Sequence, residues 1–153
     1  MDIQVIQASI EQKPVLNQLM QLYQHDSSAF TREDADQNGR FTYRFFDQYW
    51  DESDGIAFLI RCDGHLGGFV FVNSYTLVLR QGTRRSIAES FVMRKYRRQG
   101  VVRQVAFYVF GRFPGGWEVR QNSLNVAGQQ FWRTIIADYT RGKFSETVLD
   151  SPC

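Results

Sequence analysis

The sequence predicts a single α/β (α+β) domain over residues 1–153, and three observations support this prediction. The chain has 153 residues, a common length for one domain, and 43% of them are hydrophobic. Runs with strand periodicity and runs with helical periodicity follow one another in the order β α α β β β α β α β. No internal repeat, low-complexity tract or linker divides the chain. A chain of this length buries roughly 70% of its unfolded surface, so one core is enough to stabilise it.

The N-terminal third predicts one strand followed by two helices. The strand shows alternating apolar and polar residues. Ser9 with Gln12 three residues later fits a capping box, which marks the start of the first helix. The expected elements are a strand over 3–8, a helix over 10–25, a mobile loop over 26–40 and a short helix over 41–50.

The rest of the chain predicts a hairpin and then alternating strands and helices. Asp63-Gly64 joins two β-rich runs and is a strong hairpin signal. Phe113-Pro114-Gly115-Gly116 ends a helix. We expect strands over 56–62, 66–75, 86–93, 117–121 and 144–149, and helices over 103–113 and 125–139.

The composition excludes several classes of protein. The formal net charge is +2, so charge alone gives no case for a nucleic-acid partner or a polybasic membrane surface. We see no signal peptide, and no apolar run approaches the roughly 18 residues of a membrane span. Cys62 and Cys153 fit neither a disulfide framework nor a zinc site, and we expect no metal. The expected location is cytoplasmic.

A strand, a basic turn and a helix over residues 86–113 are the most informative segment. The first turn of a helix has N–H groups without intrahelical partners and a positive dipole end, which suits a phosphate. Gly100 allows a positive φ and a close approach of backbone to a ligand. Neither a P-loop nor a dinucleotide fingerprint is present. The basic residues around the turn are Arg94, Lys95, Arg97, Arg98 and Arg103.

Two blocks of this sequence resemble the GCN5-related N-acetyltransferase (GNAT) superfamily. Arg97-x-x-Gly100-x-Val102 is similar to its Arg/Gln-x-x-Gly-x-Gly/Ala signature. Asn125-x-x-Gly128-x-x-Phe131-Trp132 is similar to its Asn-x-x-Ala-x-x-Phe-Tyr helix, at the usual distance along the chain. The element order fits over nearly the whole chain. Residues 113–119 resemble a branch of uncharacterised predicted acetyltransferases.

The resemblance implies a mixed, mostly antiparallel twisted sheet, flanked by about four helices, that binds acetyl-CoA (coenzyme A) as co-substrate. Backbone N–H groups of residues 98–103 would hold the pyrophosphate, and residues 91–93 would pair with the pantetheine arm as an added strand would. Asn125 would bond to that arm, and two aromatic residues would line the acyl end. The implied cofactor-binding residues are Phe91, Val92, Met93, Arg97, Arg98, Gln99, Gly100, Val101, Val102, Arg103, Asn125, Phe131 and Trp132.

Three departures from the family pattern bear on these expectations. Val102 stands where Gly or Ala is usual, and its branched side chain narrows the approach to the phosphates. Trp132 stands where the family often has a Tyr acid, and an indole N–H cannot protonate a thiolate. The sequence given ends about where the last strand of the family begins, so one sheet edge either lacks that strand or takes it from another chain.

Acyl transfer to an amine needs a base and a donor for the oxyanion or thiolate. Glu89 is the first candidate base, and an ion pair with Arg84 or Arg61 is the equal alternative. Glu118 is the second candidate, with an ion pair to Arg120 as its alternative. Tyr139, seven residues after Trp132, is the candidate acid, with packing in the core as its alternative. Both histidines, His25 and His65, are expected to be structural.

Charge and aromatic residues before the hairpin predict the acceptor. Eight of the 16 acids lie within residues 26–54, and nine of the 18 basic residues lie within 80–112. Acids with aromatic faces suit a cationic amine, so we expect a small amine acceptor bound by a monomer or homodimer. A non-catalytic acyl-CoA-binding domain and a small nucleic-acid-binding protein are the alternatives. The residues that suggest the amine are Glu33, Asp34, Asp36, Asp47, Tyr43, Tyr49 and Trp50.

Overall fold

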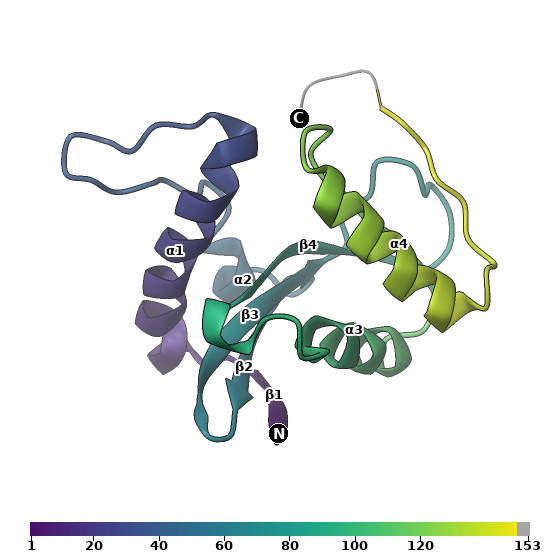
Figure 1. The fold of residues 1–153 in the computed structure, drawn as a ribbon, viewed down its shortest axis with the longest axis horizontal. Coiled ribbons are helices and arrows are strands. Elements are labelled where there is room, and N and C mark those ends of the chain that lie inside the picture. The colour runs from purple at the N-terminus through teal and green to yellow at the C-terminus, as the bar shows by residue number, and fades with distance from the viewer. Residues whose placement is uncertain (150–153) are drawn as a thin grey trace.

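A five-stranded sheet forms the centre of the protein, in a computed structural model that describes residues 1–149 (Figure 1). The strands lie side by side in the order in which they occur in the chain. The first three pairings are antiparallel and the last is parallel, which confirms the predicted mixed, mostly antiparallel sheet. The strands are β1 (Ile3–Gln7), β2 (Ile56–Cys62), β3 (His65–Asn73), β4 (Arg84–Val92) and β5 (Gly116–Val119).

Helices cover both faces of the sheet (Figure 1). One face, here called the α1 face, packs against α1 (Lys13–Thr31) and α2 (Gln48–Asp51). The other, the α3 face, packs against α3 (Val101–Arg112) and α4 (Val126–Thr140). The short 3₁₀ helices are η1 (Ile10–Gln12) and η2 (Arg94–Tyr96). Within residues 1–149, no helix is both long and apolar enough to cross a membrane.

Strict alternation along the central strand builds one core on each face. Phe69 and Phe71 of β3 point to the α1 face, whereas Val70 and Val72 point to the α3 face. All four are at most 2% exposed. A strand buried on both sides in this way holds the sheet rigid, so residues on the neighbouring β4 have fixed positions.

The first helix is longer and the second shorter than the sequence predicts. α1 continues through residues 26–31, where we expected a loop, and ends at Arg32 in a left-handed conformation (φ 63°). These extra residues include a long-range contact, since Arg97 Nη2 donates to Asp26 Oδ2 (2.6 Å). Where a helix over 41–50 is predicted, α2 covers only residues 48–51, and the aromatic side chains of Tyr43 and Phe46 before it pack on Phe71 from successive turns.

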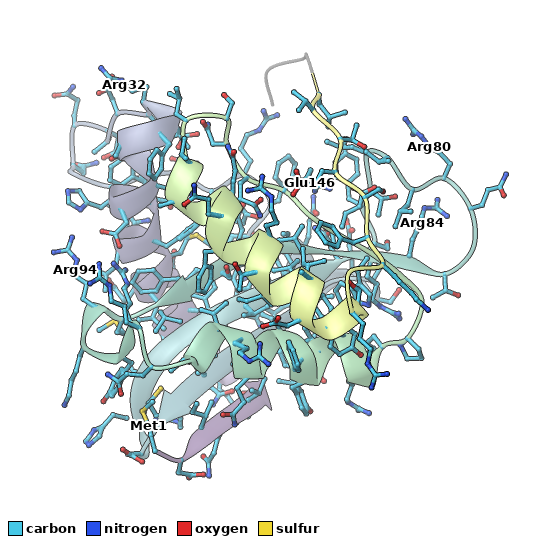
Figure 2. All side chains as sticks on the ribbon, turned by 45° about the vertical axis from the view of Figure 1, so that its right-hand side comes forward. Met1, Arg32, Arg80, Arg84, Arg94 and Glu146 are labelled. Carbon is cyan, nitrogen blue, oxygen red and sulfur yellow. The ribbon has the colours of Figure 1, made fainter. Side chains whose placement is uncertain are left out.

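The predicted strand over residues 144–149 is wrong. None of these residues belongs to a strand, and Val148 is 90% exposed. The segment runs along the outer side of α4 (Figure 1), and Glu146, labelled in Figure 2, pairs with Arg133 of that helix instead of meeting a sheet edge. β5 pairs only with β4 within the described part of the chain. Cys153 lies outside the described residues.

Candidate active site

The parallel pair β4 and β5 separates after four residues. Arg84 to Ile87 pair with Gly116 to Val119, and the chain then leaves the sheet. Within the part of the chain that the structure describes, the second half of β4, Glu89 to Val92, pairs with β3 on one side only. Its other edge has the backbone groups with which an extended ligand could form a ladder. The predicted pantetheine-binding residues Phe91 and Val92 lie in this half of β4, where the Val92 carbonyl already accepts from Arg97 Nε (2.7 Å).

A β-bulge turns Glu89 towards α1. Phe71 pairs with Glu89 and Val72 pairs with Ile87, so Ala88 is an extra residue in β4. Ile87 packs in the core of the α3 face, and regular alternation would place Glu89 there as well. Instead its carboxylate lies on the α1 face and accepts a hydrogen bond from the Tyr23 hydroxyl. Bulges often redirect side chains in this way beside active sites.

Burial dominates the electrostatics of Glu89. Desolvation raises the pKa of this carboxyl from its ordinary 4.5 to about 7, against the opposing effects of Tyr23, Arg120 and Tyr43. The alternative prediction of an ion pair is wrong. Arg84 donates to Thr76 and Gly82, and Arg61 donates to Gly64 O (3.2 Å). A partly buried carboxyl that titrates near neutrality is suited to general-base work.

Three tyrosines line the same side of the sheet as Glu89. Burial raises the pKa of Tyr23, Tyr43 and Tyr49, so all three remain neutral phenols at physiological pH. Tyr23 was not predicted, because its spacing in α1 fits the buried face of an amphipathic helix. The one signal in the sequence is a hydroxyl on an otherwise apolar face.

The predicted phosphate loop follows β4 through η2. Arg98 and Gly100 both have positive φ, 61° and 78°, and Gly100 is the N-cap of α3. Within residues 1–149, the backbone N–H groups of residues 98–103 donate no hydrogen bond. A row of unpaired N–H groups at a helix N-terminus favours an anion.

The basic side chains of this loop differ in their freedom. Arg97 Nε donates to Val92 O (2.7 Å), and its Nη2 pairs with Asp26 on α1 (2.6 Å). Arg103 pairs with Asp138 on α4 (2.6 Å). Arg98 is exposed and forms no ion pair within the described residues. Within residues 1–149, the backbone N–H groups of 98–103 and the Arg98 side chain therefore have no partner, whereas Arg97 connects the end of β4 to α1.

The start of α4 carries the second predicted block. Asn125 is the N-cap, and its Oδ1 accepts from the Gly128 N–H (2.9 Å). Trp132 is buried in the core of the α3 face, and Phe131 is 47% exposed. The Trp132 indole contributes packing to this core. It cannot act as the acid that a tyrosine would supply at this position.

We expect Asn125 to have two roles that different substitutions can separate, one as the N-cap of α4 and one as a ligand contact. Asn125→Ala should lower the free energy of unfolding by about 1 kcal/mol through loss of the cap. Asn125→Asp keeps the capping oxygen but lacks the amide donor predicted to hold the pantetheine arm. Calorimetric titration with CoA should show weaker binding for both variants, and thermal melting should show a loss for Ala alone. Unchanged CoA affinity in the Asp variant would contradict the ligand contact.

Two other candidate residues lie outside this arrangement. The ring of Tyr139 packs on Phe107 (5.0 Å) and Phe110 (5.1 Å) of α3, so it belongs to the opposite side of the sheet from Glu89. The structure gives no support for its role as the acid beside that base.

Glu118 holds the loop between β3 and β4. Its carboxylate accepts from three consecutive backbone N–H groups and pairs with Arg120 (2.9 Å), as the alternative prediction had it. Burial raises the pKa of Glu118, but these bonds outweigh it and hold the pKa below its ordinary value. A carboxylate occupied in this way is not available as a base. The donors are Leu77 (2.9 Å), Val78 (2.7 Å) and Leu79 (2.5 Å).

Comparison with solved structures identifies the class of fold. An aminoglycoside acetyltransferase from an uncultured soil metagenomic sample, in complex with sisomicin, superposes with a TM-score of 0.69 at 13% identity, over 99% of this chain and 95% of that one. AAC(6')-Iy in complex with the bisubstrate analog CoA-S-monomethyl-acetylneamine superposes with a TM-score of 0.65 at 14% identity, over 100% of both chains. A transcriptional regulator from Bacillus halodurans C-125 gives 0.70 at 14%, over 99% of both.

These similarities establish the fold of the GCN5-related N-acetyltransferases for this chain. No family model matches the sequence, and no curated protein matches it. The structural neighbours include acetyltransferases, one of them with a CoA analog bound.

Proposed function

We propose that this protein transfers an acetyl group from acetyl-CoA to the amino group of a small, cationic acceptor. The arrangement of one strand supports the proposal above all else. β4 presents a free edge over residues 88–92, ends in a loop of unpaired N–H groups, and carries Glu89 at its bulge. An anion site, a ladder for an extended arm and a base thus follow one another along one strand.

The residues at this strand fit coenzyme A. The N–H groups of residues 98–103, with the exposed Arg98, would neutralise the pyrophosphate. The free edge of β4 would bond to the amides of the pantetheine arm. Asn125 and Phe131, at the start of α4, would contact the arm and the acyl end. Val102 is only partly buried, and the N–H groups of its turn donate no backbone hydrogen bond within the described residues.

Glu89 would act as the general base, directly or through a water molecule. The carboxylate takes a proton from the ammonium group of the acceptor, and the free amine attacks the thioester carbonyl carbon. A C–N bond forms and the C–S bond breaks, so the products are an acetamide, CoA and one proton released to solvent. Trp132 cannot supply the proton for the thiolate, and water would do so.

The surroundings of Glu89 favour a cationic acceptor. Of the acids predicted for this region, Asp47 pairs with Lys13 (2.8 Å) and Asp36 caps its own turn. Glu33 remains close enough to Glu89 to raise the pKa of that carboxyl. With Tyr43 and Tyr49 it provides negative charge and aromatic faces, which attract an ammonium group.

Two measurements test the proposal. Isothermal calorimetry should show CoA binding, and absence of binding would remove the cofactor assignment. A thiol-release assay with acetyl-CoA should show turnover with cationic primary amines from a panel that also includes neutral and acidic acceptors. Turnover confined to the neutral or acidic acceptors would contradict the amine assignment.

A non-catalytic acyl-CoA-binding domain is the second candidate. The position of Trp132, where a tyrosine acid would be expected, favours it, and so does the structural similarity to the transcriptional regulator from Bacillus halodurans C-125. The same assays separate the two functions, because a binding domain would retain calorimetric CoA binding and release no thiol with any amine.

A further inference from the structure

The Tyr23 hydroxyl makes the one hydrogen bond between α1 and the carboxylate of Glu89. It donates to Oε2, from a position 66 residues away in the chain. The Tyr23 ring is fixed by edge contacts to Phe69 (centroids 5.7 Å apart) and Phe91 (6.2 Å). A phenol held on two sides by core rings has little freedom to leave its partner.

A second contact, one turn later on α1, fixes the helix against the same strand. Asp26 pairs with Arg97 (2.6 Å) and Arg94 (3.3 Å), and Arg97 Nε also holds Val92 O at the end of β4. Tyr23 and Asp26 are three residues apart and therefore lie on one helix face. The contacts from Asp26 to Arg97 and from Arg97 to Val92 O thus connect α1 to the end of β4 and fix the distance between the Tyr23 hydroxyl and Glu89.

We propose that Tyr23 is a positioning residue for Glu89: its hydroxyl binds one carboxylate oxygen and presents the other to the acceptor amine. This inference rests on the proposed function for its catalytic meaning, although the contact itself can be tested without turnover. Tyr23 touches neither reacting group in this scheme and acts only through Glu89.

The direction in which Tyr23 shifts the pKa of Glu89 follows from the groups that face this carboxyl. Tyr23 from α1, Tyr43 from the segment before α2 and Arg120 after β5 favour the carboxylate, whereas burial and Glu33 disfavour it. Removing the Tyr23 hydroxyl takes away a donor to the charged form, so the pKa of Glu89 must rise further above its value of about 7. A hydrogen bond to a charged group corresponds to about one pH unit or more.

The test is Tyr23→Phe, which keeps the ring and its two edge contacts. In the protein without ligands, carbon-13 NMR follows the resonance of the Glu89 carboxyl, which is assigned by its absence from the spectrum of Glu89→Gln. The titration midpoint of this resonance should lie about one pH unit higher in Tyr23→Phe than in the wild type. The acid limb of kcat/KM should move to higher pH by the same amount. Tyr108→Phe, an exposed tyrosine on α3, is the matched control and should change neither titration.

The outcomes separate this inference from the proposed function. An unchanged NMR midpoint in Tyr23→Phe would overturn the positioning role whatever the enzyme does. A raised midpoint with an unmoved acid limb would also overturn it, because Glu89 would then not be the group that Tyr23 serves in turnover. A wild-type protein without thiol release would contradict the proposed function and leave the NMR result to decide the contact.

Discussion

Replacing Glu89 with Gln should reduce kcat for acetyl transfer by a factor of about 10² to 10⁴, the usual contribution of a general base. Gln keeps the size and the hydrogen-bonding capacity of the side chain but cannot accept the proton of the ammonium group. CoA affinity should not change, because the unpaired N–H groups of residues 98–103 lie beyond the end of β4. Initial rates of thiol release and calorimetric titration measure the two quantities.

The same substitution should stabilise the fold above neutral pH. The folded protein raises the pKa of Glu89 from 4.5 to about 7, so its ionisation costs more in the folded than in the unfolded chain. Wild-type stability therefore falls, as far as this group contributes, while the pH rises from 4.5 to about 7. A glutamine does not ionise, so the Glu89→Gln variant does not lose stability in this way. Thermal melting at pH 8 should therefore show the variant as the more stable protein.

Glu52→Gln is the matched control, since Glu52 is exposed at the end of α2. It should change neither the rate nor the melting temperature. A Glu89→Gln protein that is fully active would exclude Glu89 as the base. A loss of rate accompanied by a loss of CoA affinity would instead indicate disruption of β4.

Local patterns predicted five of the six expected strands, because strand periodicity depends on neighbouring residues, and failed for residues 144–149. β2 has the predicted bounds, and β3 and β4 differ from theirs by one or two residues at each end. The bulge at Ala88 was not predictable, because it is defined by the register of β4 against β3. The sequence therefore named Glu89 but could not tell which face of the sheet would carry it.

Contacts between distant residues explain what the sequence reasoning missed. The extra turns of α1 depend on Asp26, whose partner Arg97 is 71 residues away. That partner, a predicted cofactor-binding residue, also donates to Val92 O, a contact that local sequence patterns do not show. Helical spacing predicts that Tyr139 lies on the same face as Trp132, but it does not indicate which element this face contacts. In the structure it meets Phe107 and Phe110 of α3.

Gly100 should be the most sensitive position of the cofactor loop. Its φ of 78° lies in the left-handed region, and a Cβ there would meet no atom within 4 Å, so only backbone strain opposes a side chain. An L-residue in this conformation costs roughly 1 to 2 kcal/mol. Gly100→Ala can relieve that strain by moving the loop, which would turn the N–H groups at the start of α3 away from the pyrophosphate.

We therefore expect Gly100→Ala to weaken CoA binding about tenfold by calorimetry, the equivalent of about 1.4 kcal/mol. Gly142 is the matched control, because it has the same conformation (φ 80°) and the same open surroundings at the far end of α4. Gly142→Ala carries equal backbone strain and should lower the melting temperature to a similar degree, yet leave CoA affinity unchanged. Equal CoA affinity in the two variants would mean that the backbone of this loop does not hold the phosphates, and the anion site would have to be sought elsewhere on the protein.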